Sequence, residues 1–287
     1  MQKEYLVAHS PDADDIFMYY AIKFGWVGVK NKKFSNISAD IETLNQAFLK
    51  GEYLIGAISF GVYPKIHSDY ALLRCAGSFG SGYGPKLIKK KSKILKRNFK
   101  VALSGENTTN ALLFRLEYPD ARVVYKNFME IEEAVLKDEV DAGVLIHESI
   151  LEFDSSLEVE AELWDIWLDM ANEELPLPLG GMAISRSLPL LDAIEIEDVL
   201  TKAVDVANKN KSILSKMIYE RGLFRVDEEK LKTYLNMYAN DNSVTFTDEA
   251  LKGIDKLFEI GYNGGVFKEL IKAEDMLIPK EYLEARF

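Results

Sequence analysis

His147 is the residue best suited to move a proton, because a neutral imidazole can accept one near pH 7. The chain contains three histidines, His9, His67 and His147. His147 follows the apolar run A-G-V-L-I, which is typical of a buried strand, and strand ends in α/β sheets face the ligand cleft. We therefore predict a general base at His147. The alternative is a histidine that only satisfies a local hydrogen bond.

A second segment has the chemistry of an anion site. G-E-N-T-T-N, residues 105–110, lies between a predicted strand and a predicted helix. The first amides of a helix are unpaired and carry partial positive charge, so Thr108 and Thr109 could hold an anion there. Capping of this helix by Asn107 or Thr108 is compatible with such a site. The chain has no phosphate-binding or dinucleotide-binding glycine motif in a strand–helix setting, so ATP and dinucleotide folds are unsupported.

Two other polar residues have open assignments. Ser59 ends the predicted strand L-I-G-A-I, where a cleft would open, but it could equally cap the segment that follows. Asn45 lies on a predicted helix within D-I-E-T-L-N-Q, a place that taken alone is more often surface than ligand. Both residues are candidates for substrate contact.

The segment H-S-P-D-A-D-D, residues 9–15, superficially resembles the A-H-P-D-D-E zinc motif of sugar deacetylases. Two inserted residues change its spacing, and the later histidine pair of that family is missing. A zinc site also usually needs more than one histidine beside its carboxylates, so we predict no metal. The expected role of Asp12 or Asp14 is to cap the following helix, whose dipole favours an acidic group.

The scaffold that must position these residues is an alternation of short apolar runs and amphipathic stretches. Strands are predicted at 5–8, 54–58, 70–74, 101–103, 122–125 and 142–146, and helices at 13–23, 41–50, 108–116 and 130–137. This order predicts mainly parallel sheets with helices on both faces. Beyond about residue 190, the segments 195–209, 211–221, 227–237 and 247–261 all look helical, which predicts a C-terminal helical layer.

Two segments rich in glycine and proline, 77–85 and 175–181, look like crossings between domains. They predict one lobe from residues 1–87 plus 184–287 and a second lobe from residues 88–183. The hinge is expected near 84–90 and 178–186. Two-lobed proteins of this kind usually bind a small ligand between the lobes.

Composition narrows the class of partner. The 287 residues include 35 basic and 46 acidic side chains, a net charge of −11, which argues against nucleic acid or an anionic membrane. A single cysteine, Cys75, excludes an intramolecular disulfide and a cysteine-built zinc site. The basic run at 86–100 is interpreted as a solvated turn beside a strand. Without a signal-peptide core or a membrane-length apolar run, a cytoplasmic protein is expected.

The motifs together resemble those of the 1,4-dihydroxy-6-naphthoate synthases of the futalosine route to menaquinone. Each piece is weak alone, but their order and spacing along most of the chain are specific. The pieces are S-P at 10–11, D-I-E-T-L-N at 40–45, A-I-S at 57–59, G-x-G-x-G-P at 80–85, T-T at 108–109, A-G-V-L-I-H-E-S at 142–149, L-P-L-P-L-G at 175–180 and T-Y-L-N at 233–236.

The resemblance implies a fold like a type II periplasmic binding protein, with two α/β lobes joined by a hinge. It implies a cofactor-free lyase that fragments cyclic dehypoxanthinylfutalosine and releases 1,4-dihydroxy-6-naphthoate, as a monomer or homodimer acting on a small-molecule carboxylate. His147 matches the family's proton acceptor. The implied substrate contacts are Ala57, Ile58, Ser59, Thr108, Thr109 and Asn110, with Asn45, Ser10 and Asp15 at further cleft positions.

One motif departs from the family pattern. Where familiar members read S-P-C-P-N-D-T, this chain reads S-P-D-A-D-D-I, so Asp15 alone keeps the acidic position and Asp14 replaces an asparagine. This turn faces the cleft in the implied fold, and the added negative charge could change what binds. The rival interpretations are a non-catalytic carboxylate-binding protein of the same fold and the chorismate dehydratase of the same pathway.

Overall fold

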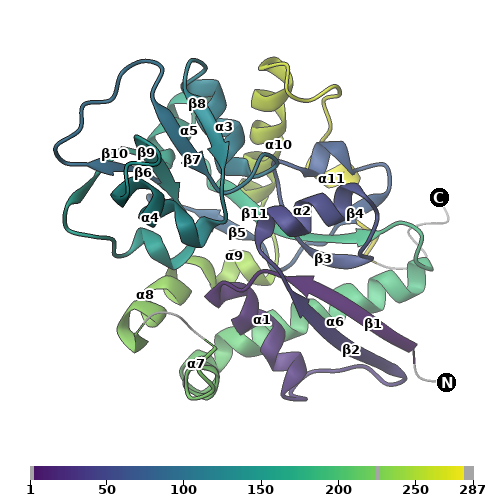
Figure 1. The fold of residues 1–287 in the computed structure, drawn as a ribbon. Coiled ribbons are helices and arrows are strands. Elements are labelled where there is room, and N and C mark those ends of the chain that lie inside the picture. Colours follow the sequence, from purple (N-terminus) through teal and green to yellow (C-terminus); the bar gives the residue numbers. More distant parts are fainter. Residues whose placement is uncertain (1–2, 224–226, 281–287) are drawn as a thin grey trace.

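Two β-sheets organise the molecule, and we call each sheet with the helices that pack on it a lobe (Figure 1). The computed structural model describes residues 3–223 and 227–280, apart from the side chains at positions 13, 14 and 242. The first sheet contains β1 (Lys3–His9), β2 (Lys32–Ser38), β3 (Ile55–Ser59), β4 (Tyr70–Leu72), β5 (Ser78–Gly80) and β11 (Leu177–Ser185). The second contains β6 (Lys86–Lys90), β7 (Lys100–Leu103), β8 (Arg122–Tyr125), β9 (Ala142–Leu145) and β10 (Leu157–Glu162).

The first sheet has the order β2-β1-β3-β11-β4, and β5 also pairs with β11. β1 runs parallel to β2 and β3, whereas β11 runs antiparallel to β3, β4 and β5. Gly56 allows the close approach of β3 to β1, because a Cβ there would lie 2.4 Å from the Ala8 carbonyl oxygen. The parallel pairing brings the carboxyl ends of β1 and β3 to one edge, where Ser10 and Ser59 follow or end the strands.

The second sheet has the order β10-β6-β9-β7-β8. β7 is parallel to β8 and β9, and β6 is antiparallel to β9 and β10. Each sheet is therefore mixed. The parallel pairs make up one side of it, β2-β1-β3 in the first sheet and β9-β7-β8 in the second, and the antiparallel pairs make up the other side. The carboxyl ends of β7 and β9 share an edge, so the turn before residue 108 and the segment at His147 are neighbours.

Helices cover both sheets. Those of the first lobe are α1 (Ala13–Lys23), α2 (Ile41–Leu49), η1 (Tyr63–Lys65), α6 (Leu190–Lys209), α7 (Lys211–Tyr219), α8 (Glu228–Tyr238), α9 (Asp241–Val244), α10 (Asp248–Asn263) and α11 (Ala273–Met276). Those of the second are α3 (Thr109–Glu117), η2 (Phe128–Glu130), α4 (Ile131–Leu136), η3 (His147–Ile150) and α5 (Leu163–Ala171). The predicted C-terminal helical layer is confirmed: α1 packs on α6, α7 and α8, and α10 packs on β11 and α5.

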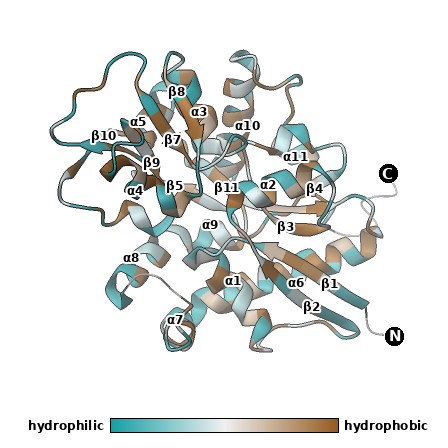
Figure 2. Ribbon diagram, viewed as in Figure 1, coloured by the Kyte–Doolittle hydropathy of each residue, from teal (hydrophilic) through white to brown (hydrophobic). Residues whose placement is uncertain are grey.

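The apolar residues lie on the strands and on the inner faces of the helices, as the hydropathy colouring of β3, β7 and β9 shows (Figure 2). Trp167 on α5 is fully buried and donates from its indole N–H to the Leu175 carbonyl oxygen at 2.8 Å. Within the described residues, no helix combines the length and the apolar character that a membrane span requires.

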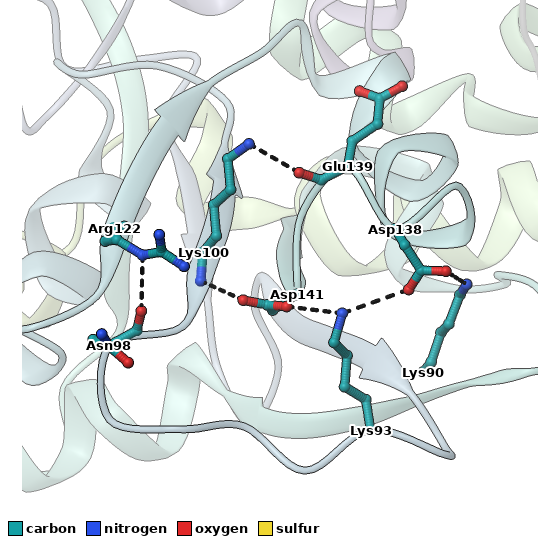
Figure 3. A network of polar contacts seen from close by, with 8 residues as sticks. All are labelled: Lys90, Lys93, Asn98, Lys100, Arg122, Asp138, Glu139 and Asp141. Atoms are coloured by element: carbon teal, nitrogen blue, oxygen red, sulfur yellow. Dashed lines mark hydrogen bonds and ion pairs between the residues drawn. The ribbon is translucent and has the colours of Figure 1, made fainter.

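The basic run at 86–100 is only partly the solvated turn that we predicted. Its first five residues form β6, in which Leu87 and Ile88 are fully buried between β9 and β10. Three lysines of the run, Lys90 at the end of β6, Lys93 and Lys100, join a surface network with Asp138, Glu139 and Asp141 (Figure 3). There the Lys93 ammonium lies 2.8 Å from Asp141, and Asp141 also accepts the Lys100 backbone N–H at 2.7 Å.

Candidate active site

A cavity between the lobes collects most of the residues singled out from the sequence. Its walls come from both sheets and from α8. The predicted site residues that line it are Ser10, Asp15, Ala57, Ile58, Ser59, Thr108, Thr109, Asn110 and His147. Asn45 does not line the cavity, but it contacts Ser59 from behind.

His147 stands at the first position of η3, directly after the residue that ends the A-G-V-L-I run. Its φ of 56° lies in the left-handed region, a strained conformation that a non-glycine residue keeps only where the surrounding structure holds it. Its Nδ1 lies 2.7 Å from Asp12 Oδ2, and its ring meets Phe128 edge-on at 4.6 Å between centroids. Nε2 is buried and has no hydrogen-bond partner among the described residues. No hydrogen bond among the described residues therefore occupies this atom.

The protonation of His147 is governed by the carboxylates around it. Burial alone would lower the pKa of the imidazole, but the charge and hydrogen bond of Asp12, with a smaller contribution from Glu148, raise it above the ordinary histidine value. Burial likewise opposes ionisation of Asp12, yet His147 holds the pKa of that carboxyl below its usual range. The two side chains therefore stabilise each other's charged forms.

Asp12 corrects one prediction. It occupies the N-cap position of α1, but its side chain makes no capping hydrogen bond and turns to His147 instead. The helix-capping role predicted for Asp12 is therefore wrong. The side chain of Asp14, the other candidate cap, lies outside the described residues.

Asp15 sits beside this pair on the first turn of α1. Its Oδ2 accepts the Ser10 backbone N–H at 2.7 Å. Burial, reinforced by the nearby Asp12 charge, raises the pKa of Asp15 to about 8. Asp15 is therefore largely protonated at neutral pH and can donate a hydrogen bond or a proton.

Ser59 is held by Asn45 in a defined orientation. The Ser59 backbone N–H donates to Asn45 Oδ1 at 2.9 Å, which fixes the amide so that Nδ2 donates to Ser59 Oγ at 3.0 Å. The Ser59 oxygen is thus an acceptor in this pair, and its own proton remains available for an oxygen in the cavity. The helix position of Asn45, which suggested a surface residue, places it fully buried.

The turn before α3 is anchored more firmly than its sequence indicated. Thr108 caps α3, accepting the Ala111 N–H at 3.3 Å and donating to the Gly105 carbonyl oxygen at 3.0 Å. Thr109 Oγ1 donates to the Leu179 carbonyl oxygen at 2.9 Å and accepts the Gly61 N–H at 3.0 Å. The hydroxyl groups of Thr108 and Thr109 are therefore used in hydrogen bonds within the protein. A ligand at this turn would instead interact with the N-terminal end of α3, which carries a partial positive charge.

His9 and His67 have structural surroundings. His9 Nδ1 lies 2.7 Å from the Ser10 carbonyl oxygen, its Nε2 lies 2.9 Å from the Asn36 amide, and its ring stacks on Tyr19. His67 lies 3.4 Å from Glu269, away from the cavity. Among residues 3–223 and 227–280, no cluster of three or more histidine, cysteine or acidic side chains could hold a metal ion.

Two tyrosines of α8 line the cavity but were not predicted from the sequence. Tyr234 and Tyr238 are one helical turn apart, pack on each other at 4.8 Å between ring centroids, and line the cavity. Their spacing in T-Y-L-N-M-Y was a usable signal, since residues four apart share a helix face. Of the described residues that line the cavity, none is a lysine or an arginine. An anionic ligand would therefore rely on hydrogen-bond donors rather than on a cation.

Comparison with known proteins gives consistent results. A family model for menaquinone biosynthesis matches residues 5–263. The 1,4-dihydroxy-6-naphthoate synthases of Streptomyces coelicolor and Thermus thermophilus are 27% and 26% identical to this chain, covering 86% and 87% of it and 89% and 90% of their own lengths.

Solved structures show the fold. A protein from Archaeoglobus fulgidus is 36% identical, with a TM-score of 0.84, over 92% of this chain and 98% of that one. The alkanesulfonate-binding protein of Xanthomonas axonopodis pv. citri is 11% identical, with a TM-score of 0.67, over 96% of this chain and 97% of that one. The expected periplasmic-binding-protein-like architecture is therefore confirmed.

Proposed function

The chain belongs to the menaquinone biosynthesis family, and we propose that it is a lyase that converts cyclic dehypoxanthinylfutalosine into 1,4-dihydroxy-6-naphthoate. Two curated relatives that cover most of the chain carry the name of that synthase. The observation that supports the chemistry most directly is the buried, unpartnered Nε2 of His147 at the wall of the inter-lobe cavity. A base there has a proton-accepting atom and a place for a substrate.

In the proposed reaction His147 removes a proton from the cyclised substrate. The sugar-derived portion then leaves by cleavage of a carbon–carbon bond, and aromatisation of the naphthalene ring drives the step. A base positioned at its substrate typically contributes a factor of about 10² to 10⁴ to the rate. The buried site favours this role because water would otherwise compete for Nε2.

The substrate carboxylate is proposed to bind at the opposite wall. The Ser59 hydroxyl, oriented by Asn45, supplies one donor, and the N-terminal end of α3 supplies the favourable field. Tyr234 and Tyr238, whose rings are tilted by 46° to each other, give this cavity an aromatic wall against which a fused ring can pack. The acidic side chains lie around His147, so the carboxylate is directed away from the base.

Two alternatives use the same cavity. A non-catalytic binding protein would hold a carboxylate here without needing His147 to accept a proton. A chorismate dehydratase would turn over chorismate instead. Assaying both substrates separates the three functions.

The test is to incubate the purified protein with cyclic dehypoxanthinylfutalosine and to detect 1,4-dihydroxy-6-naphthoate by chromatography and mass spectrometry. A His147→Asn variant is assayed in parallel, because asparagine tolerates the left-handed backbone at this position better than alanine does. We expect product from the wild type and a loss of about 10² to 10⁴ in kcat for the variant.

His67→Asn is the matched control, since it makes the same change at a histidine outside the cavity. It should retain wild-type activity. Product formed at an undiminished rate by His147→Asn would remove His147 as the base while keeping the lyase. A saturable thermal shift with the substrate, but no product from any protein, would favour the binding protein.

A further inference from the structure

The contact between Asp12 and His147 joins the two lobes. Asp12 follows β1 in the first lobe, and His147 follows β9 in the second. The 2.7 Å distance between Oδ2 and Nδ1 therefore spans the wall of the cavity and requires the lobes to be together. Both side chains are largely shielded, with 7% and 15% of their side-chain surfaces exposed.

We propose that Asp12 is a positioning residue for the base: it holds the Nδ1–H of His147 across the cleft and so directs an unprotonated Nε2 to the substrate. This inference rests on the proposed function for its kinetic consequence, but its structural content does not require a substrate. It also gives a role to the position at which the chain departs from the S-P-C-P-N-D-T pattern.

The tautomer follows from the chemistry of the pair. A carboxylate only accepts hydrogen bonds, so neutral His147 must carry its proton on Nδ1 to keep the 2.7 Å contact. The lone pair is then on Nε2, the buried atom without a partner among the described residues. Without Asp12, the neutral ring could carry its proton on either nitrogen, and in one of these forms Nε2 is no base.

Several other titratable groups lie near His147, but among the described residues Asp12 is the one whose carboxylate contacts Nδ1. The charged or titratable side chains nearby are Asp15 on α1, Glu148 on η3, His9 on β1, and Tyr234 and Tyr238 on α8. Asp15 is engaged with the Ser10 N–H. Phe128 packs against the ring but cannot accept a hydrogen bond as a carboxylate does. The Asp12 carboxylate is aligned with Nδ1 and therefore sets the direction of Nε2.

The lobes are also connected away from this pair. Glu42 on α2 accepts the backbone N–H of Asn107 at 3.0 Å and its side-chain amide at 2.8 Å. Lys65 donates to the Asn107 side chain at 2.8 Å. Removing the Asp12 charge therefore leaves contacts that hold the lobes together, and Asp12→Asn is an isosteric change suited to isolating the effect on His147.

The experiment compares wild type and Asp12→Asn by kinetics and by nitrogen-15 NMR of the histidine rings. We expect kcat to fall by about 10² to 10⁴, as for an aspartate that orients a catalytic histidine elsewhere, with little change in KM. The acidic limb of the kcat/KM profile should move to lower pH, because the carboxylate that stabilises the imidazolium is gone. A purely structural role would lower activity without moving that limb.

The NMR arm needs no substrate. His67→Asn and His147→Asn assign the three ring systems, and we expect wild-type His147 to be the Nδ1–H tautomer above its pKa, with this preference lost in Asp12→Asn. Asp198→Asn, a change at an exposed aspartate paired with Lys202, is the control and should alter neither readout. An Nε2–H tautomer in the wild type, or an unchanged kcat and acidic limb in Asp12→Asn, would overturn the proposal. If the wild type makes no product, the proposed function fails, and the tautomer alone decides the role of Asp12.

Discussion

Two clusters of opposite charges, one in the cleft and one on the surface, show how differently the same residue types behave in this molecule. In the cleft, Asp12 and His147 meet with little exposed side-chain surface. On the second lobe, Lys90, Lys93 and Asp138 form ion pairs in which the aspartate side chain is 59% exposed (Figure 3). Solvent screens the surface pairs, whereas the buried pair keeps its full influence on protonation.

Burial, and not the number of charges, therefore distinguishes the cluster in the candidate site from the cluster on the surface. In the surface network Asp138 and Lys93 each have two oppositely charged partners, so the loss of one contact leaves another in place. The cleft cluster has few members and holds one carboxyl, Asp15, whose pKa is raised to about 8. Groups with such perturbed pKa values in a cavity are typical of functional sites.

A buried pair without charge gives the largest expected change in stability. Asn45→Ala removes the two hydrogen bonds between Asn45 and Ser59, so the buried Ser59 N–H loses its acceptor and the hydroxyl oxygen loses a donor. We expect the free energy of unfolding to fall by about 1–3 kcal/mol, and the KM for substrate to rise because Ser59 is no longer oriented. Urea unfolding and steady-state kinetics measure the two effects.

Gln46→Ala is the control on the same helix, since Gln46 is only partly buried and contacts Glu42 within one turn. It should cost clearly less than Asn45→Ala. Equal losses from the two variants would mean that helix propensity, rather than the Ser59 contacts, accounts for the effect.

Local sequence signals account for the parts of the fold that were predicted well. The helix over 13–23 and the strand over 122–125 agree with α1 and β8, because their apolar periodicity and end signals lie within the segments themselves. The edge strand β2 was not predicted. It pairs on one side with β1 and carries a polar sequence, K-K-F-S-N-I-S, so no apolar run reveals it.

β11 shows that proline and glycine can also lie within a strand. The segment 175–181, where we predicted a crossing, follows α5 and runs into this strand, and Pro178, Gly180 and Gly181 lie inside the strand. The register shifts between Pro178 and Gly180, which accommodates the proline, and a Cβ on Gly181 would lie 2.8 Å from the Phe60 ring. Proline and glycine serve an irregular strand and close packing here rather than a turn.

The candidate site was predictable one segment at a time but not as a set of contacts. Strand ends and a helix start identified His147, Ser59 and the turn before α3. The partner of His147 could not be found this way, because Asp12 lies far from it in the sequence and the capping signal was stronger. Only the packing of the two lobes brings the carboxylate to the imidazole.

Asp15→Asn tests how the buried Asp15 carboxyl affects the free energy of unfolding. In the unfolded chain Asp15 ionises near its ordinary pKa, so between about pH 4 and about 8 the folded protein holds a proton that the unfolded chain releases. The unfolded state binds fewer protons, and the free energy of unfolding therefore falls as pH rises through this window. Asparagine can still accept the Ser10 N–H and has no charge to desolvate.

We therefore expect Asp15→Asn to raise Tm at pH 7 by roughly 2 °C or more, and to flatten the decline of stability between pH 5 and 8 to about the level that His147 alone produces. His147 contributes in the same direction, since its raised pKa gives stability below about pH 6.5 that is lost as pH rises through the folded value. Thermal unfolding across this pH range is the measurement. A lower Tm at pH 7 with an unchanged pH slope would contradict the interpretation.

The surface network should respond least, and its two aspartates should differ. Asp141 is partly buried and accepts the Lys100 backbone N–H, so Asp141→Ala is expected to lower the free energy of unfolding by about 1 kcal/mol or less. Asp138 is exposed and contacts only lysine side chains in the network of Figure 3, so Asp138→Asn should leave stability and kcat unchanged within error at 0.15 M salt. Urea unfolding at low and physiological salt, with the lyase assay, compares the two. A loss of activity in Asp138→Asn as large as that in Asp12→Asn would mean that an exposed charge on the second lobe influences catalysis in the cavity. Burial would then not separate the two clusters in their effect on activity.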